Sequence, residues 1–477
     1  ILNRNVKRIL ELVVKCHTFE NYKYANETDL KAHAIIDRTI GAEGIVLLDN
    51  RSVLPLTANV KTIALYGTTS YDMVPAGMGF GSTGVGYYCV SLVEGMRNAG
   101  YTVDADLIKK YKKHLFDEQK RLYPNGKPPF SLTPLKRAEE FVPTSDELSA
   151  QVKNNDVAII TLGRTSGEAS DRRVEEFYLK ENESALIKQV AEAYHAAGKK
   201  VIVILNICSP VETASWKNMV DAVICAFQPG QEVGNCVADV LTGKVNPSGH
   251  LPMTFAIKYG DAPSDSNFPY DYEFKMPLFA MGSGMNFESK EKEEKPKEAV
   301  RNVDFTDYEE GIYVGYRYFE TFDKEVSYPF GHGLSYTTFS FEIVSSDING
   351  DNCEMKVAVK NTGNCAGKES VQVYVKAPAG GLEKPAKELK AFAKTKLLQP
   401  GESEVVTLSW KLMDMASLNE KSSSWELPKG TYQWMVGASS ADVRCTVTQK
   451  VSKVQKVKVH NAMIPPYKIA QHDMVKR

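Results

Sequence analysis

Short, almost continuously apolar segments alternate with helical patterns through the first half of the chain. Segments of this kind suit strands that are buried on both faces of a sheet, and they occupy 62–67 (TIALYG), 157–162 (VAIITL), 201–205 (VIVIL) and 222–227 (AVICAF). Strands buried on both faces belong to sheets that are covered by helices. The pattern therefore predicts an α/β domain.

Apolar positions recur at helical spacing after the second and fourth of these strands. The first set comprises Leu186, Ile187, Val190 and Tyr194. Gly198 follows it, where a left-handed helix cap is expected. The second set comprises Val233, Cys236, Val237, Val240 and Leu241. The order strand, helix, strand, helix predicts a mostly parallel sheet flanked by helices, with functional loops at the carboxyl ends of the strands.

From Asp347 onward the apolar positions recur every second residue. Half-buried strands of this type are expected at 354–360, at 406–410 and at 432–436, separated by turn sequences such as Asn-Thr-Gly-Asn and Gln-Pro-Gly-Glu. The pattern predicts an all-β sandwich of roughly 110 residues.

These patterns divide the chain into regions. We expect a linker from another domain at 1–30, the α/β domain at 31–335, the β-sandwich at 336–450 and a tail at 451–477. Three stretches are interpreted as lying outside both cores: an insertion at 110–143, which extends to about residue 150, a charge run at 288–297 within a linker of about 270–308, and the basic tail. The charge run is expected to be a solvated loop, with a partner site as the alternative.

Composition narrows the kinds of ligand. With 477 residues the chain exceeds one ordinary core, and its net charge of -1 provides no field to gather nucleic acid or an anionic membrane. The sequence contains no apolar stretch of about eighteen residues, so it predicts no membrane-spanning helix. We therefore expect a small or neutral ligand, with no nucleic acid and no membrane as partner.

The eight cysteines occur singly, and those in apolar runs are expected to be free thiols in the core. A disulfide between Cys353 and Cys365 across a hairpin is the alternative. The chain begins with Ile1 and without the layout of a secretory signal, so we expect its natural N-terminus upstream. The compartment stays open, with a soluble cytoplasmic protein favoured over a periplasmic or secreted one.

Charged residues are concentrated directly after the strand at 157–162. The segment 163–172 (GRTSGEASDR) contains Arg164, Glu168, Asp171 and Arg172. Arginines can position a carboxylate by ion pairing, and glycine lets the backbone approach a ligand. From residue types alone, a surface cluster of salt bridges is the simpler interpretation and a functional carboxylate is the alternative.

A longer stretch of sequence, 156–268, resembles the α/β-sandwich domain of family 3 glycoside hydrolases, especially bacterial β-glucosidases. The resemblance rests on DVAIITLGRTSGEASDR (156–172), VILNICSPVE (203–212), QPGQEVGN (228–235) and ADVLTGKVNPSGHLPMTF (238–255). It extends to IGAEGIVLLDN (40–50), EGIYVGYRYF (310–319) and YPFGHGLSY (328–336). The run KNTGNCAGKESVQVYV (360–375), with LKAF (389–392), resembles the family's fibronectin type III-like domain.

This resemblance implies that Glu168 is the general acid/base of a retaining β-glycosidase. Such an enzyme also needs a carboxylate nucleophile, which in the family is an aspartate on a preceding barrel. Residues 1–12 resemble the last helix of that barrel, so we expect the barrel outside this chain, upstream of Ile1 or as a separate chain. Ala169 stands where the family usually has glycine, which would stiffen the loop.

The resemblance also implies roles for other residues. Ser82, in the glycine-rich run 77–86, and Arg172 are expected to contact the sugar, while Asp171 and Arg164 hold the acid/base loop in shape. The glycine-rich run lacks the lysine and spacing of a nucleotide site. Because His250 and His332 have no partners at metal-ligand spacing, we expect no metal and no cofactor. The tryptophans at 216, 410 and 434 are expected in cores, with sugar stacking as the alternative.

The resulting hypothesis is part of a retaining exo-β-glycosidase, a β-glucosidase that removes terminal non-reducing β-D-glucosyl residues and is inactive without the barrel. Its expected partners are the barrel domain and a β-linked oligosaccharide or aryl β-glycoside, and homo-oligomerisation stays open. A β-xylosidase of the same family is one alternative. A noncatalytic carbohydrate-binding or structural module is the alternative from another class.

Overall fold

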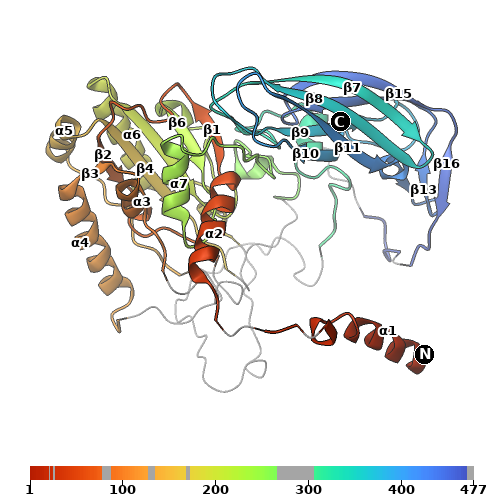
Figure 1. Ribbon diagram of the computed structural model, residues 1–477, viewed down its shortest axis with the longest axis horizontal. Coiled ribbons are helices and arrows are strands. Elements are labelled where there is room, and N and C mark those ends of the chain that lie inside the picture. The colour runs from red at the N-terminus through yellow and green to blue at the C-terminus, as the bar shows by residue number, and fades with distance from the viewer. Residues whose placement is uncertain are drawn as a thin grey trace.

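The computed structural model describes residues 1–20, 22–24, 27–77, 88–126, 135–167, 172–265, 306–462 and 464–469. Two sandwich domains lie beside each other, and their strands run in separate sheets (Figure 1). The first domain is α/β and the second is all-β. The predicted fold class is therefore confirmed.

The α/β domain is built on a six-stranded sheet in the order β1-β6-β5-β4-β2-β3. Its strands are β1 (Val46–Asn50), β2 (Thr62–Tyr66), β3 (Thr102–Val103), β4 (Val157–Gly163), β5 (Lys200–Asn206) and β6 (Ala222–Cys225). The strands from β3 to β6 pair in parallel, whereas β1 runs antiparallel to β6 at the edge. All four strands expected from the sequence are present.

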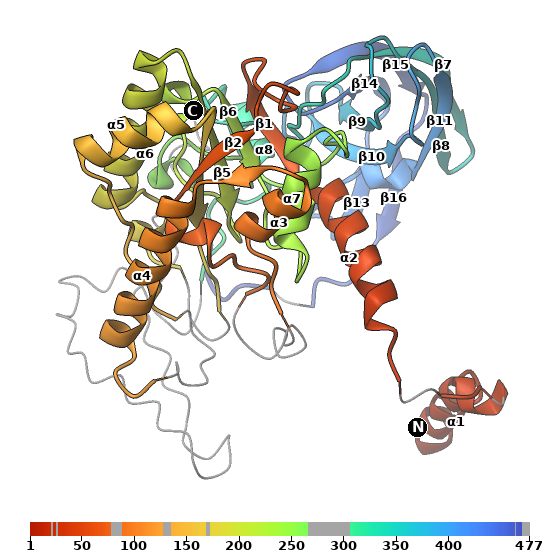
Figure 2. The ribbon, with the colours of Figure 1, turned by 60° about the vertical axis from the view of Figure 1, so that its left-hand side comes forward.

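Helices cover both faces of this sheet because neighbouring strand residues point to opposite sides. They are α2 (Leu30–Gly44), α3 (Leu92–Asn98), α4 (Ala105–Leu122), α5 (Ser145–Asn154), α6 (Glu181–Ala196) and α7 (Val233–Leu241). On one face, Ile160 and Val203 pack in a core with α4, α5 and α6. On the other, Ile159 and Ile202 pack in a core with α2, α3 and α7 (Figure 2).

The interpretation of 110–143 as an insertion outside the core is wrong at both ends. Tyr111 on α4 is fully buried, and its ring contacts Phe141 edge-on at 5.5 Å and stacks on Tyr71 at 4.7 Å. Both ends of this stretch therefore belong to the α/β core. Helical spacing on α4 continues across the expected boundary, and the Lys-rich composition of its exposed face concealed this.

The all-β domain contains three antiparallel sheets. One is β10-β9-β14-β15, made of Glu388–Lys394, Ser370–Lys376, Gly430–Gly437 and Val443–Val451. The second is β11-β8-β7, made of Ser403–Lys411, Asn352–Asn361 and Phe339–Asn349. The third is β12-β13-β16, made of Ser417–Asn419, Ser424–Leu427 and Gln455–Lys458.

Three expectations, about the tryptophans, the tail and the cysteines, can be compared with the structure. Trp410 and Trp434 are buried and meet edge-on at 4.5 Å, and Trp216 is buried in the α/β core, so the prediction of core tryptophans is confirmed. The tail interpretation is wrong for 455–458, because β16 pairs with β13.

Cys353 lies in the core and Cys365 donates to the carbonyl of Tyr336, and neither forms a disulfide.

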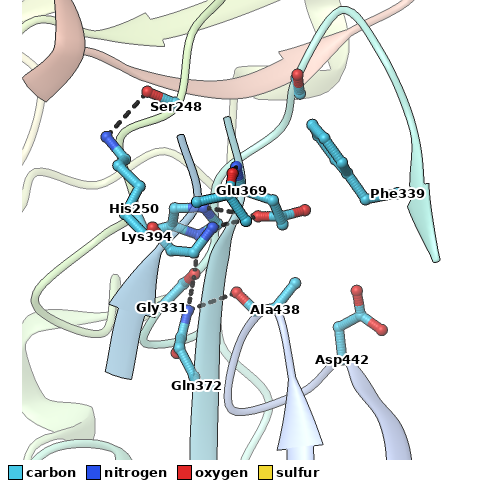
Figure 3. A network of polar contacts seen from close by, with 12 residues as sticks. Ser248, His250, Gly331, Phe339, Glu369, Gln372, Lys394, Ala438 and Asp442 are labelled. Carbon is cyan, nitrogen blue, oxygen red and sulfur yellow. Dashed lines mark hydrogen bonds and ion pairs between the residues drawn. The ribbon is translucent and has the colours of Figure 1, made fainter. Parts of the chain in front are cut away.

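A polar network joins the two domains (Figure 3). Nδ1 of His250 lies 2.6 Å from the carbonyl oxygen of Gly331, and its Nε2 lies 3.2 Å from Glu369 of the β-sandwich. The buried Gln372 on β9 donates to the carbonyls of Gly331 and Ala438 at 3.2 and 2.6 Å. These contacts fix the segment around Gly331 between the domains.

Two short helices complete the described chain, α1 (Leu2–Val13) and α8 (Tyr316–Thr321). Helix α1 buries none of its residues and lies apart from both domains (Figures 1 and 2). Among the described residues, no helix combines the length and the apolar character needed to cross a bilayer.

Candidate active site

The carboxyl ends of β2 and β4 lie close together, and each has a glycine. Gly67 directly follows β2, and Gly163 is the last residue of β4. Gly67, after β2, has φ +86°, and a Cβ there would lie 2.3 Å from the carbonyl oxygen of Thr161. A Cβ on Gly163 would lie 2.4 Å from Oγ1 of Thr69. The two glycines therefore let the 3-10 turn η2 (Thr68–Ser70) pack against the end of β4.

Arg164 is the first residue after β4, and its side chain is buried. Nη1 and Nη2 donate to the two carboxylate oxygens of Glu183 at 2.6 and 2.7 Å. Nε and Nη2 also donate to the carbonyls of Glu176 and Tyr178. The predicted role of Arg164 in loop positioning remains a proposal, but its guanidinium has the contacts that such a role requires.

Asn206, the last residue of β5, joins the segments that follow η2 and β6 at this edge of the sheet. Its Oδ1 accepts from the backbone nitrogen of Val74 at 2.7 Å, and its Nδ2 donates to the carbonyls of Val74 and Phe227. Phe227 has φ +51°, a left-handed conformation that is unfavourable for a bulky residue. Strained backbone of this kind is concentrated at functional sites, where the surrounding contacts hold it in place.

The start of the glycine-rich run lies against the loop that follows β4. A Cβ on Gly77 would lie 3.0 Å from Oγ of Ser166, so these two segments are in contact. Ser82, Glu168 and Asp171 lie outside the described residues. The structure thus brings together Gly77, at the start of the run that contains Ser82, and Ser166, two residues before Glu168.

Arg172 marks the other end of this loop. Its guanidinium donates to Oγ of Ser209, to the carbonyl of Pro210 at 3.1 Å and to the carbonyl of Glu176 at 2.8 Å. The described residues provide no carboxylate partner for Arg172, and burial lowers its pKa. Arg164 and Arg172 both donate to the carbonyl of Glu176, so the ends of the loop share an anchor.

Glu140 also lies at this edge of the sheet, and the sequence analysis did not predict it as a site residue. Its two oxygens accept from the backbone nitrogen and the hydroxyl of Thr68 at 2.8 and 2.7 Å. Burial raises the pKa of Glu140 to about 7. Glu183 and Asn206 were missed as well. The one local signal concerned Glu183, because an acidic residue in the first turn of α6 is typical of a helix start.

Among the described residues, no three histidine, cysteine, aspartate or glutamate side chains are placed to hold a metal ion. His332 is half-buried, and its Nε2 lies 2.8 Å from the carbonyl oxygen of Leu48. His250 takes part in the domain interface. Both histidines are thus in structural contacts.

Comparison with known proteins gives matches over most of the chain. The profile described as "Glycosyl hydrolase family 3 C-terminal domain" matches residues 45–336, and that of the "Fibronectin type III-like domain" matches 369–440. Beta-glucosidase A of Butyrivibrio fibrisolvens is 34% identical over 92% of this chain and 54% of the relative. An exo-alpha-(1->6)-L-arabinopyranosidase of Bifidobacterium breve is 29% identical over 94% of this chain and 52% of the relative.

Among solved structures, beta-glucosidase 3B from Thermotoga neapolitana, in complex with alpha-D-glucose, superposes with a TM-score of 0.81. The superposed region covers 94% of this chain and 58% of that protein, and the two are 39% identical in sequence. The chain thus spans little more than half the length of these relatives. From the match over 45–336 it follows that the chain belongs to glycosyl hydrolase family 3, whose C-terminal domain it carries together with a fibronectin type III-like domain.

Proposed function

We propose that this chain is part of a retaining exo-β-glucosidase that removes terminal non-reducing β-D-glucosyl residues, with Glu168 as general acid/base. The observation that carries the proposal is the anchoring of the loop on both sides of Glu168. Arg164, four residues before it, is paired with the buried Glu183, and Arg172, four residues after it, is bonded to Ser209 and Pro210. A catalytic group needs such support, because small displacements are costly for catalysis.

Glu168 would act twice in one turnover. It first donates a proton to the departing glycosidic oxygen while a second carboxylate attacks the anomeric carbon. Esterification removes the negative charge of that nucleophile, so the pKa of the glutamate falls and it can accept a proton from water. The contact between Gly77 and Ser166 supports a role for Ser82 as a sugar contact, because it joins the two loops. Asp171 would help to hold the acid/base loop.

The nucleophile would be an aspartate on a barrel domain outside these 477 residues. The coverage of little more than half of the relatives supports this arrangement. Helix α2 supports it too, because Ile35, Ile36 and Ile40 are 68%, 53% and 67% exposed. An apolar helix surface of this kind suits packing against another domain.

The test compares Glu168→Ala with the wild type in an assembly that contains the barrel. Hydrolysis should fall by about 100-fold or more. With an activated aryl β-glucoside, azide should partly restore turnover and yield a β-glucosyl azide, because azide needs no general base. The chain 1–477 alone should not hydrolyse the substrate. Unchanged activity of Glu168→Ala would overturn its role, and full activity of the isolated chain would overturn the need for a barrel.

A second specificity is favoured by one comparison. The arabinopyranosidase relative matches 94% of this chain, which is compatible with a sugar other than glucose. A panel of aryl β-glucoside, β-xyloside and α-L-arabinopyranoside substrates would rank these candidates and the β-xylosidase alternative. An assembly that bound sugars and hydrolysed none of them would instead indicate a noncatalytic module.

A further inference from the structure

A cavity of about 820 Å³ lies where the α/β domain meets the β-sandwich. Its walls come from distant parts of the chain and include Arg172, Tyr259, Asp265, Glu310, Tyr316 and Glu388. The volume lies within the range of about 300–1,000 Å³ that is typical of sites for small ligands. Arg172 connects this cavity to the anchored loop described above.

Glu310 is the least expected residue in this wall. It is only 6% exposed, and among the described residues its carboxylate has no hydrogen-bond or ion-pair partner. Other buried glutamates are paired: Glu183 with Arg164, and Glu369 with His250. The oxygens of Glu310 are not among the inaccessible polar atoms without a partner, and the residue lines the cavity, so its carboxylate is placed to accept hydrogen bonds from a ligand there.

Aromatic rings form part of the same wall. Tyr259 is half-buried and meets Phe177 edge-on at 5.8 Å, and Tyr316 stacks on Phe330 at 4.6 Å. Neighbouring rings and packing hold these side chains in place, which limits the entropy lost when a ligand binds. Aromatic faces suit the apolar faces of pyranose rings.

The charges around the cavity balance. Among the residues that the structure describes, three arginines (Arg172, Arg173 and Arg317) and three carboxylates (Asp265, Glu310 and Glu388) line it. Burial raises the pKa of Asp265. A balanced wall favours a neutral molecule with many hydroxyl groups over an anion or a cation.

We propose that this cavity binds a neutral oligosaccharide, with Glu310 accepting hydrogen bonds from sugar hydroxyls and the faces of Tyr259 and Tyr316 contacting pyranose rings. The binding itself does not depend on hydrolysis. The choice of a β-linked gluco-oligosaccharide as the probe rests on the proposed function.

The test is calorimetric titration of the 477-residue chain with cellotetraose. Wild type should bind saturably, and Glu310→Gln should weaken the affinity about tenfold or more, because hydrogen bonds from sugar hydroxyls to a charged carboxylate become weaker bonds to a neutral amide. Tyr259→Leu should weaken it as well. Glu325→Gln removes the same charge from an exposed position of the neighbouring segment and should retain wild-type affinity. Unfolding midpoints near that of wild type would show that the variants are folded.

Three results would overturn the proposal: no binding at millimolar cellotetraose, equal affinity of wild type and Glu310→Gln, or loss of binding in Glu168→Gln with retention in Glu310→Gln. The last result would place the sugar at the acid/base loop alone. Glu168→Gln should bind cellotetraose as wild type does and should lose only hydrolysis in the assembly with the barrel. The proposal about the cavity and the proposal about Glu168 can therefore be contradicted independently.

Discussion

Arg164 and Glu183 form a two-point ion pair, with distances of 2.6 Å between Nη1 and Oε1 and 2.7 Å between Nη2 and Oε2. The pair joins the end of β4 to the first turn of α6, and Glu183 also accepts from the backbone nitrogen of Lys180. One carboxylate thus supports the helix start and the loop that contains Glu168. Both side chains are nearly inaccessible, with 10% and 5% exposure.

Glu183→Gln should destabilise the protein by about 3–5 kcal/mol, because it leaves the guanidinium of Arg164 buried without its counter-charge. Urea unfolding at neutral pH measures the change. Asp117→Asn, which removes the exposed pair between Asp117 and Lys113, is the control and should change stability by less than about 0.5 kcal/mol. Equal effects of the two substitutions would contradict this account of the pair.

Gly163→Ala should destabilise the end of β4 by about 1–3 kcal/mol, because the new methyl group would overlap Oγ1 of Thr69. In a double-mutant cycle, Thr69→Ala should recover much of this loss. Gly44→Ala introduces a methyl group with no neighbour within 4 Å and should be nearly neutral. Additive effects of the substitutions at 163 and 69 would show that the close approach does not determine stability.

Glu140 should make stability fall as pH rises. Burial raises its pKa from the ordinary 4.5 to about 7, so between these values the folded state binds more protons than the unfolded state. This contribution is full below about pH 4.5 and is lost as pH rises through about 7, with a total of roughly 3 kcal/mol.

Glu140→Gln should remove that slope, since the amide cannot ionise. Urea unfolding of wild type and variant from about pH 5 to pH 8 measures the difference between the two curves. Glu139→Gln, at the adjacent exposed carboxylate, should keep the wild-type slope. Parallel curves for wild type and Glu140→Gln would contradict the shifted pKa.

Gln372→Leu should weaken the joint between the domains. Its Nε2 donates to Gly331 and Ala438, and its Oε1 accepts from the hydroxyl of Tyr374. The carbonyl of Gly331 keeps its contact with His250, whereas the carbonyl of Ala438 and the hydroxyl of Tyr374 lose the partner that Gln372 provides. A loss of about 2–3 kcal/mol is expected in calorimetry or urea unfolding. Gln433→Leu on the exposed side of β14 is the control, and a similar loss there would indicate a nonspecific effect.

Local features of the fold could be predicted because they depend on neighbours along the chain. The apolar runs at 157–162 and 201–205 became β4 and β5, and the pattern from Leu186 to Tyr194 became part of α6. Gly198 has φ +69°, as its place after the helix suggested. The alternating strands and the buried tryptophans of the β-sandwich followed from the same kind of reasoning.

The boundaries of the core were less predictable. Tyr111 and Phe141 lie in a stretch rich in charged and turn-forming residues, and their contact joins positions that are 30 residues apart. Strand β16 was missed because four residues at a sheet edge carry little pattern. Composition reports the average exposure of such stretches, whereas single buried side chains decide where a core ends.

The amino-acid sequence by itself determined the order of the elements, the two-domain fold and, through the resemblance carried by 156–172, the expectation about Glu168. Only the tertiary structure paired Arg164 with Glu183, joined Asn206 to Val74 across 132 positions and placed Glu310 beside a cavity with no partner in the described part of the chain. The physical reason is that periodicity records which residues face a core, while hydrogen bonds and ion pairs depend on atoms that meet only after distant segments have packed.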